Sequence, residues 1–125
     1  MSRTLTPWTI AGVPGAEMAD WCRALNDDNP IHLEREAAER LGFGPNRVNP
    51  GPANLAYLMN MVMLDDPQAE IARVDASFLA NLVEDETAVA VGEVVAPDRV
   101  TASLHRPASG APVVEAVFQL RPRTR

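Results

Sequence analysis

The sequence predicts an α+β fold in which an antiparallel sheet wraps around one central, buried helix. The first observation is the segment from Pro52 to Asp65, which is apolar around almost its whole circumference, a pattern typical of a buried helix. The second is the other half of the chain, where apolar and polar residues alternate in segments separated by short turns. Such alternation is typical of strands with one face buried.

Before the central helix, the chain is predicted to form one strand and two helices. The strand runs from Arg3 to Ile10, and a helix then starts at Pro14, since the first turn of a helix needs no N–H from proline. A second short helix follows from Leu33 to Leu41. Apolar residues at helical spacing are expected to face the core: Met18, Trp21, Cys22 and Leu25 on the first helix, and Ala37, Ala38 and Leu41 on the second.

After the central helix, four strands are predicted, in the ranges 73–82, 87–95, 100–105 and 114–121. The turns between them are marked by Glu84-Asp85-Glu86, by Pro97-Asp98 and by the segment 107–112. Short turns between strands favour pairing of each strand with the next. The sequence therefore predicts a four-stranded meander that curls around the central helix.

Length and composition narrow the class of protein. The 125 residues fit one domain, 1–125, and the net charge of −6 argues against nucleic acid or an anionic membrane as partner. The N-terminus lacks the apolar core of a signal peptide, and the apolar run 55–64 is too short to span a bilayer. A single cysteine, Cys22, excludes an internal disulfide and a cysteine zinc site. A cytoplasmic location is expected.

The candidate active site is the segment Asp27-Asp28-Asn29-Pro30-Ile31-His32. Proline fixes its own φ and keeps the preceding residue out of the helical region, so the segment is expected to form a rigid corner. A carboxylate and an imidazole held towards the same space can perform general acid–base chemistry. Asp27 and His32 are therefore the candidate catalytic residues, with Asp28 as the alternative carboxylate.

These residues resemble the MaoC-like, (R)-specific enoyl-thioester hydratase/dehydratase family of the hotdog fold. The Asp-x-Asn-Pro-x-His motif of that family is matched by Asp27, Asn29, Pro30 and His32, and its Phe-Gly step by Phe43-Gly44. The family opens its central helix with His-Gly-Met, where this chain has Pro50-Gly51-Pro52. The glycine is kept, whereas the histidine and the methionine are replaced.

The resemblance implies a homodimer whose sheets pair edge to edge. It implies an acyl thioester substrate, carried on coenzyme A or on an acyl carrier protein, and reversible addition of water across the α,β double bond. No metal and no redox cofactor is implied. In the family, the Asp and His hold one water between them, which assigns that role to Asp27 and His32, and the Asn helps to hold the water, which assigns that role to Asn29.

The altered helix start adds a prediction from the residues themselves. Pro50 and Pro52 have no N–H, so Gly51 is the only backbone donor of the three, and its N–H is expected to bind the thioester oxygen at the helix N-terminus. Asn49 and Asn54 are further candidates for binding substrate or water. Asn54 and Asn60 are expected either to bond to the sheet backbone or to face the site, and Tyr57 to do the same or to pack.

Two other functions compete with hydration of a thioester. One is a hotdog enzyme that uses the same pair for isomerisation, cyclisation or conjugate addition, which the altered Pro-Gly-Pro step motivates. The other is a non-catalytic hotdog that binds an acyl carrier. For either carrier, a local basic patch is expected within the acidic chain, and its candidate residues are Arg40, Arg47, Arg73, Arg121 and Arg123.

Overall fold

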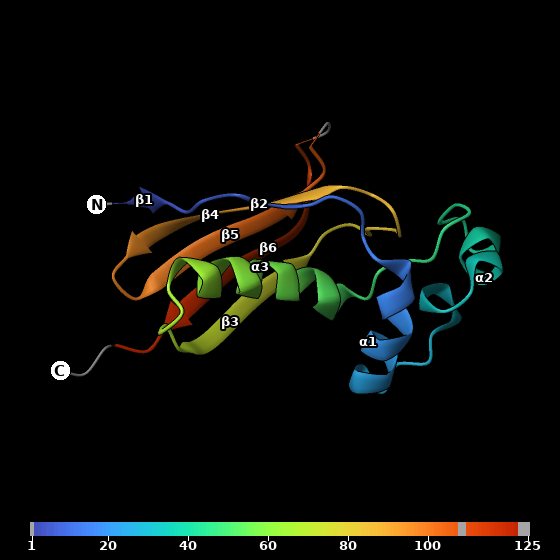
Figure 1. Ribbon diagram of the computed structural model, residues 1–125, viewed down its shortest axis with the longest axis horizontal. Coiled ribbons are helices and arrows are strands. Elements are labelled where there is room, and N and C mark those ends of the chain that lie inside the picture. The colour runs from blue at the N-terminus through green and yellow to red at the C-terminus, as the bar shows by residue number, and fades with distance from the viewer. Residues whose placement is uncertain (1, 108–109, 123–125) are drawn as a thin grey trace.

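A computed structural model describes residues 2–107 and 110–122 of the chain. One long helix packs on a sheet, and the shorter helices lie together beyond one end of that sheet (Figure 1). In chain order the elements are β1 Arg3–Thr4, β2 Trp8–Ile10, η1 Gly15–Glu17, α1 Met18–Leu25, η2 Pro30–His32, α2 Arg35–Arg40, α3 Gly51–Asp65, β3 Ile71–Phe78, β4 Ala88–Ala96, β5 Arg99–His105 and β6 Pro112–Leu120, where η marks a 3-10 helix.

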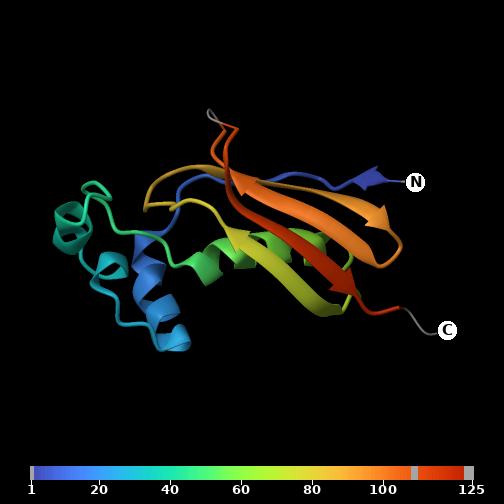
Figure 2. The ribbon, with the colours of Figure 1, turned by 180° about the vertical axis from the view of Figure 1, so that it is seen from behind.

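The sheet is antiparallel, with the strand order β1-β4-β5-β6-β3 and with β2 also paired to β4 (Figure 2). The predicted meander is right for β4, β5 and β6. It is wrong for β3, which pairs with β6 rather than with β4, placing Ala76 opposite Ala116. Glu84-Asp85-Glu86 is accordingly not a hairpin turn. It lies in the connection that leads from β3, at one edge of the sheet, across to β4 near the opposite edge.

Two predicted strands are shorter than expected, because some of their residues lie in the connections between strands. The strand predicted at 73–82 ends at Phe78, and Leu82 is fully buried in the crossing connection, where Val83 forms a bridge with Val48. The strand predicted at 3–10 is divided into β1 and β2, and Pro7 between them has no N–H to give to a ladder.

The core lies between α3 and the inner face of the sheet. Leu58, Met61 and Val62 of α3 are buried there, together with inner-face residues of the strands, among them Val100, Leu104, Val114 and Phe118. The opposite side of α3 is open: Asn60 is exposed, and Leu64 is 67% exposed. The prediction of burial on nearly all sides is therefore wrong for this chain taken alone, because one sheet covers only one side of a helix.

The helices α1 and α2 are also less buried than predicted. On α1, Met18 and Cys22 are buried as expected, but Trp21 is only partly buried and Leu25 is 37% exposed. On α2, Ala37 and Ala38 are buried, whereas Leu41 beyond its end is 67% exposed. Both helices lie beyond the end of the sheet, where few elements are available to cover them (Figure 1). Within the described residues, no helix combines the length and apolar character that crossing a bilayer requires.

The two faces of α3 give a stability prediction. Leu58→Ala removes a side chain with no exposed surface and should lower the free energy of unfolding by about 2–5 kcal/mol, because it leaves a cavity against the sheet. Leu64→Ala, on the open side of the same helix, should change it by less than about 1 kcal/mol. Urea denaturation at one fixed protein concentration measures both. Equal losses would contradict the assignment of the core to one side of α3.

Candidate active site

The corner that carries Asp27 and His32 is shaped by local hydrogen bonds. Helix α1 ends at Asn26 in the left-handed conformation (φ 54°, ψ 42°), and the Asp27 N–H donates to the Cys22 carbonyl over 2.8 Å. The Asn29 side chain accepts from the Ile31 N–H over 3.3 Å and so caps η2. The Asp27 Oδ1 in turn accepts from the Asn29 N–H over 3.0 Å. Most of these hydrogen bonds therefore join residues close together in the chain.

His32 is buried, and its ring is oriented by the backbone of a distant segment. The ring Nδ1 lies 2.7 Å from the Val48 carbonyl oxygen. A carbonyl oxygen only accepts hydrogen bonds, so Nδ1 must carry the hydrogen. In the neutral ring, Nε2 is then left with a free lone pair. The Val48 carbonyl thus selects the tautomer in which His32 presents a base towards Asp27.

The structure brings Asp27 and His32 together. The Asp27 Oδ2 lies 3.5 Å from the His32 Nε2, and the side chains are 36% and 10% exposed, respectively. This separation is longer than an ordinary direct hydrogen bond between nitrogen and oxygen. A carboxylate and an unprotonated Nε2 are both acceptors, so a water that donates to each of them suits the pair. Asp28, the alternative carboxylate, is exposed and has no hydrogen bond or ion pair among the described residues.

Asn29 has a structural role as a helix cap, which is typical of an Asn before Pro. Its side-chain oxygen accepts from the Ile31 N–H and so caps η2, and the residue is exposed. The role in holding water that the resemblance implies for Asn29 stays a prediction.

Asn49 and Asn54 form a buried pair beside the start of α3. The Asn49 Nδ2 donates to the Asn54 Oδ1 over 2.6 Å, and the Asn49 N–H donates to the Leu82 carbonyl over 2.7 Å. Asn54 therefore bonds to a neighbouring side chain rather than to the sheet backbone. The exposed Asn60 takes part in no such pair.

Tyr57 packs against Trp8 and also forms a hydrogen bond with Asn49. Its ring meets Trp8 edge to face, with the ring centroids 6.0 Å apart. Burial and the nearby Glu17 carboxylate raise the pKa of Tyr57, while a hydrogen bond with Asn49 acts in the opposite direction.

Gly51 begins α3, and its N–H has no acceptor among the described residues. The next two available donors, the N–H groups of Ala53 and Asn54, both bond to the Pro50 carbonyl over 3.0 and 3.3 Å. The Phe78 ring lies over Gly51, so that a Cβ at this position would be 3.2 Å from the ring. The N-terminus of a helix attracts negative charge. The Gly51 N–H is therefore a free donor at the start of a 15-residue helix.

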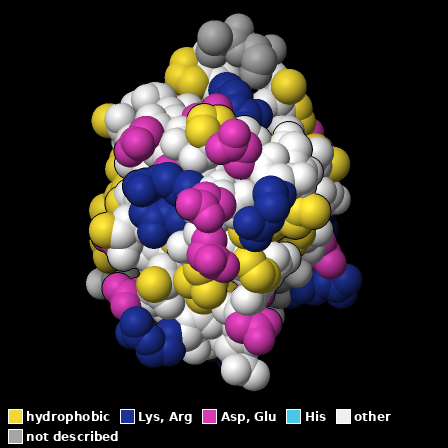
Figure 3. All heavy atoms as spheres, turned by 90° about the vertical axis from the view of Figure 1, so that its right-hand side faces the viewer, with side chains coloured by type: hydrophobic (Ala, Val, Ile, Leu, Met, Phe, Trp, Pro, Cys, Tyr) yellow, Lys and Arg dark blue, Asp and Glu magenta, His cyan; other side chains and the backbone are white. Residues whose placement is uncertain are grey.

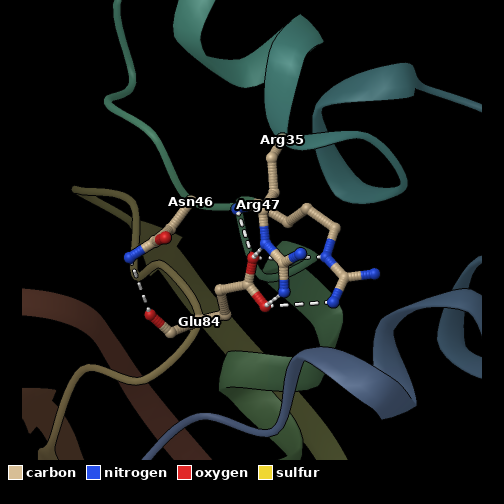
Figure 4. Close-up of polar contacts among 4 residues, drawn as sticks. All are labelled: Arg35, Asn46, Arg47 and Glu84. Carbon is tan, nitrogen blue, oxygen red and sulfur yellow. Dashed lines mark hydrogen bonds and ion pairs between the residues drawn. The ribbon is translucent and has the colours of Figure 1, made fainter.

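Sequence reasoning missed Glu84, which it assigned to a turn. The side chain is only 3% exposed, and it pairs with Arg35 and Arg47 (Figure 4). These partners lie 49 and 37 residues away in the chain. No local pattern in the sequence marks such a pairing, because it arises only when the crossing connection packs against the segment that precedes α3.

Three of the candidate arginines for the expected basic patch are bound to carboxylates. Arg47 is bound to Glu84, Arg73 pairs with Asp75, and Arg121 pairs with Glu70. Arg40 is exposed, and Arg123 lies outside the described residues. Acidic and basic side chains instead alternate over the end of the molecule that carries α1 and α2 (Figure 3). At this end of the molecule, opposite charges therefore lie side by side.

A groove on the outer face of the sheet is separate from the corner. An open groove of about 980 Å³ on the outer face of the sheet is lined by residues such as Thr101, Ser103 and Glu115, and none of its lining residues belongs to the corner. The described residues contain no group of three or more His, Cys, Asp or Glu side chains placed to hold a metal ion. Burial, followed by the nearby Asp27 carboxylate, raises the pKa of the Cys22 thiol.

No family model and no curated protein matches the sequence, but solved structures do. An (R)-hydratase from A. caviae involved in PHA biosynthesis has a TM-score of 0.85 at 17% identity, over 98% of this chain and 96% of that one. The HadBC complex, a (3R)-hydroxyacyl-ACP dehydratase of Mycobacterium tuberculosis, has 0.80 at 17% over 96% of each chain. A MaoC-like dehydratase from Rhodospirillum rubrum has 0.73 at 18%, over 98% and 93%.

The chain has the hotdog fold of these hydratases and dehydratases. The corner of Asp27 and His32 precedes α2, and the segment 41–50 leads from α2 to the start of α3. The hydrogen bond from the His32 Nδ1 to the Val48 carbonyl joins the corner to that segment. At identities of 17–18%, the similarity concerns the fold. The geometry of the site rests on the contacts of this chain alone.

Glu84 makes the stability of the hotdog depend on pH. Burial opposes its ionisation, but the hydrogen bonds from Arg35 and Arg47 outweigh burial and lower the pKa of Glu84 from 4.5 to about 2. The folded pKa lies below the unfolded one, so the contribution is complete above about pH 4.5 and is lost as the pH falls towards 2. It corresponds to roughly 3 kcal/mol at neutral pH.

The Glu84→Gln variant tests this dependence. It should be less stable than the wild type at pH 7, and its free energy of unfolding should fall less steeply between about pH 5 and pH 2. Urea denaturation across that range measures both proteins. Parallel curves for the two proteins would show that Glu84 is not the group that titrates.

Proposed function

We propose that the chain is a hotdog hydratase or dehydratase that adds water across the α,β double bond of an acyl thioester, or removes it. The observation that carries the proposal is the 3.5 Å gap between the Asp27 Oδ2 and the His32 Nε2, with Nδ1 held by the Val48 carbonyl. Structurally similar proteins with this fold are described as hydratases and dehydratases, which supports the same class of reaction here.

In the hydration direction, one water donates a hydrogen bond to each member of the pair. Its oxygen bonds to Cβ as one of its O–H bonds breaks, and the released proton passes to the acid–base pair. The double bond becomes single, and its electrons move towards the thioester carbonyl. The pair returns a proton to Cα, so that Asp27 and His32 end in their starting states. Such proton transfers by positioned side chains typically contribute about 10²–10⁴-fold to the rate.

The negative charge that develops on the thioester oxygen needs a donor. The N–H of Gly51 supplies one in the proposal, since it has no acceptor among the described residues and opens a 15-residue helix. Donors held in place before the reaction stabilise an enolate-like transition state at little further cost. The substrate would thus lie between the corner and the start of α3, with coenzyme A or an acyl carrier protein as its carrier.

The second candidate function is different acid–base chemistry on a related thioester, namely isomerisation, cyclisation or conjugate addition. The observation that favours it is the start of α3, where prolines flank Gly51 and the Phe78 ring closes over it. Replacing two side chains at this rim changes the shape of the space beside the pair. The same pair of acceptors would then move a proton between substrate atoms.

Substitution of the pair tests the proposal. Asp27→Asn and His32→Gln should each lower kcat for hydration of an enoyl thioester by about 10²–10⁴-fold, because the amide side chain that replaces either group cannot take up a proton. The assay follows the loss of enoyl absorbance with crotonyl and longer enoyl thioesters of both carriers. Asp28→Asn is the matched control and should stay within about threefold, since Asp28 is exposed beside the same corner.

The outcomes separate the candidates. Full activity in both pair variants would contradict a catalytic role for Asp27 and His32. No change in absorbance with any chain length or carrier, for a folded wild-type protein, would contradict hydration and favour the second candidate or a non-catalytic carrier-binding hotdog.

The same proposal includes a homodimer joined through β3. This strand forms one edge of the sheet, with Phe78 and Leu79 each 52% exposed at its end. The opposite edge holds only the short strands β1 and β2. A long, open and partly apolar edge is a surface that proteins usually cover. A second copy paired along β3 would also lie beside Phe78, and hence beside Gly51.

Light scattering coupled to size exclusion tests the dimer. The expected mass is twice the chain mass of 13.5 kDa, with no dependence on concentration in the micromolar range. Leu79→Asp, which places a charge at the β3 edge, should shift the mass towards that of one chain. A wild-type mass of one chain at every concentration would contradict the dimer.

A further inference from the structure

Glu84 joins the two segments that hold His32. Arg35 opens α2, three residues after His32, and Arg47 directly precedes Val48. Both guanidinium groups bind the one carboxylate of Glu84 (Figure 4). The side chain of Glu84 comes from the crossing connection between β3 and β4. Three separate parts of the chain therefore meet at this carboxylate.

The Glu84 carboxylate accepts five hydrogen bonds from the two arginines. Arg35 donates from Nε to Oε1 over 2.6 Å and from Nη2 to Oε2 over 3.2 Å. Arg47 donates from Nη2 to Oε2 over 3.0 Å, from Nε to Oε1 over 3.3 Å, and from its backbone N–H to Oε1 over 3.0 Å. Forked arginine–carboxylate contacts fix direction as well as distance. They hold the backbone of Arg47 in place together with its side chain.

Hydrogen bonds around Arg47 connect Glu84 to the peptide group that contacts the His32 ring. The Glu84 N–H donates to the Arg47 carbonyl over 2.9 Å, and the Asn49 N–H donates to the Leu82 carbonyl over 2.7 Å. The Val48 N–H, in turn, donates to the Ile31 carbonyl over 2.8 Å. The Val48 peptide is therefore held on both sides, and its carbonyl oxygen meets the His32 Nδ1. Only one further residue, Pro50, separates Asn49 from Gly51.

We propose that Glu84 is the positioning residue of the site: through Arg47 it holds the Val48 carbonyl against the His32 Nδ1, and through Arg35 it holds the start of the helix that follows His32. The inference rests on the proposed function, because it assigns Glu84 a part in the reaction of that site. Glu84 does not touch the reacting atoms. It fixes the tautomer by which Nε2 faces Asp27.

The chain around Glu84 is shaped to admit this cluster. Gly15, at the start of η1, lies so close that a Cβ there would be 2.0 Å from the Glu84 Oε2 and 2.8 Å from the Arg47 Nη2. Real Cβ atoms do not approach other atoms so closely, so only glycine leaves room for the paired carboxylate. A fourth segment of the chain thus packs its backbone against the same group.

The test compares Glu84→Gln with Glu86→Gln. Glu86 lies in the same connection and is also paired with an arginine, Arg106, and its carboxylate accepts from the Val83 N–H over 2.9 Å. Glu86→Gln therefore disturbs the same connection but leaves the contacts of Glu84 with Arg35 and Arg47 in place. Both variants remove one charge from a partly or fully buried ion pair. Glu84→Gln should lower kcat for the enoyl thioester by about 10–100-fold with KM changed by less than about threefold. Glu86→Gln should leave both within about threefold.

A second readout does not depend on activity. Nitrogen-15 NMR of histidine-labelled protein reports the tautomer of each ring, and His105→Gln assigns the two histidines. The wild type and Glu86→Gln should show His32 with its hydrogen on Nδ1. Glu84→Gln should show a mixture of tautomers or exchange broadening. If Glu84→Gln does not fold, Arg35→Met carries the test, since the Arg35 side chain is 60% exposed and its loss frees only one side of the carboxylate.

The results distinguish this inference from the proposed function. An unchanged His32 tautomer in folded Glu84→Gln overturns the inference whether or not the protein hydrates thioesters. Equal losses of kcat in Glu84→Gln and Glu86→Gln also overturn it, since they point to general destabilisation. Inactive wild-type protein with an altered tautomer in Glu84→Gln overturns the proposed function and leaves the positioning of His32 by Glu84 intact.

Discussion

The hydrogen bond between the His32 Nδ1 and the Val48 carbonyl sets the orientation and the tautomer of the neutral His32 ring. At 2.7 Å it places the hydrogen on Nδ1 and leaves Nε2 free towards Asp27. In the other tautomer, Nδ1 would be an acceptor that faces the Val48 carbonyl oxygen, which is also an acceptor. The Nε2 would then donate to the Asp27 carboxylate. The pair would then lose one of its two acceptors for water. A backbone carbonyl is well suited to this task, because it cannot exchange donor and acceptor roles.

The corner of the site could be predicted from the sequence because its restraints are local. Asp27, Asn29 and Pro30 act on neighbours only a few residues away, through a carboxylate, a capping amide and a fixed φ. The strands β4, β5 and β6 could be predicted for the same reason, since short turns join each to the next. Local rules of this kind do not depend on how distant parts of the chain meet.

The rest of the fold depends on meetings that no local pattern records. The strand β3 pairs with β6, although β4 and β5 lie between them in the chain. The open side of α3 follows from having only one sheet to cover it. Glu84 reads as a turn residue because its partners are tens of residues away. The orientation of His32 belongs to the same class, since Val48 is 16 residues from it. The sequence therefore predicted that Asp27 and His32 lie together at the corner better than it predicted how they are held.

The contact between Gly15 and the buried carboxylate has a consequence for the variation that this chain can tolerate. A side chain at position 15 would occupy the space of Glu84 Oε2, so replacing the glycine alone would expel the charge and separate its two arginines. In a randomised library under selection for function, position 15 should accept larger residues only in clones where position 84 has become small or apolar. The two positions would then vary together, although 69 residues (84 − 15) lie between them in the chain.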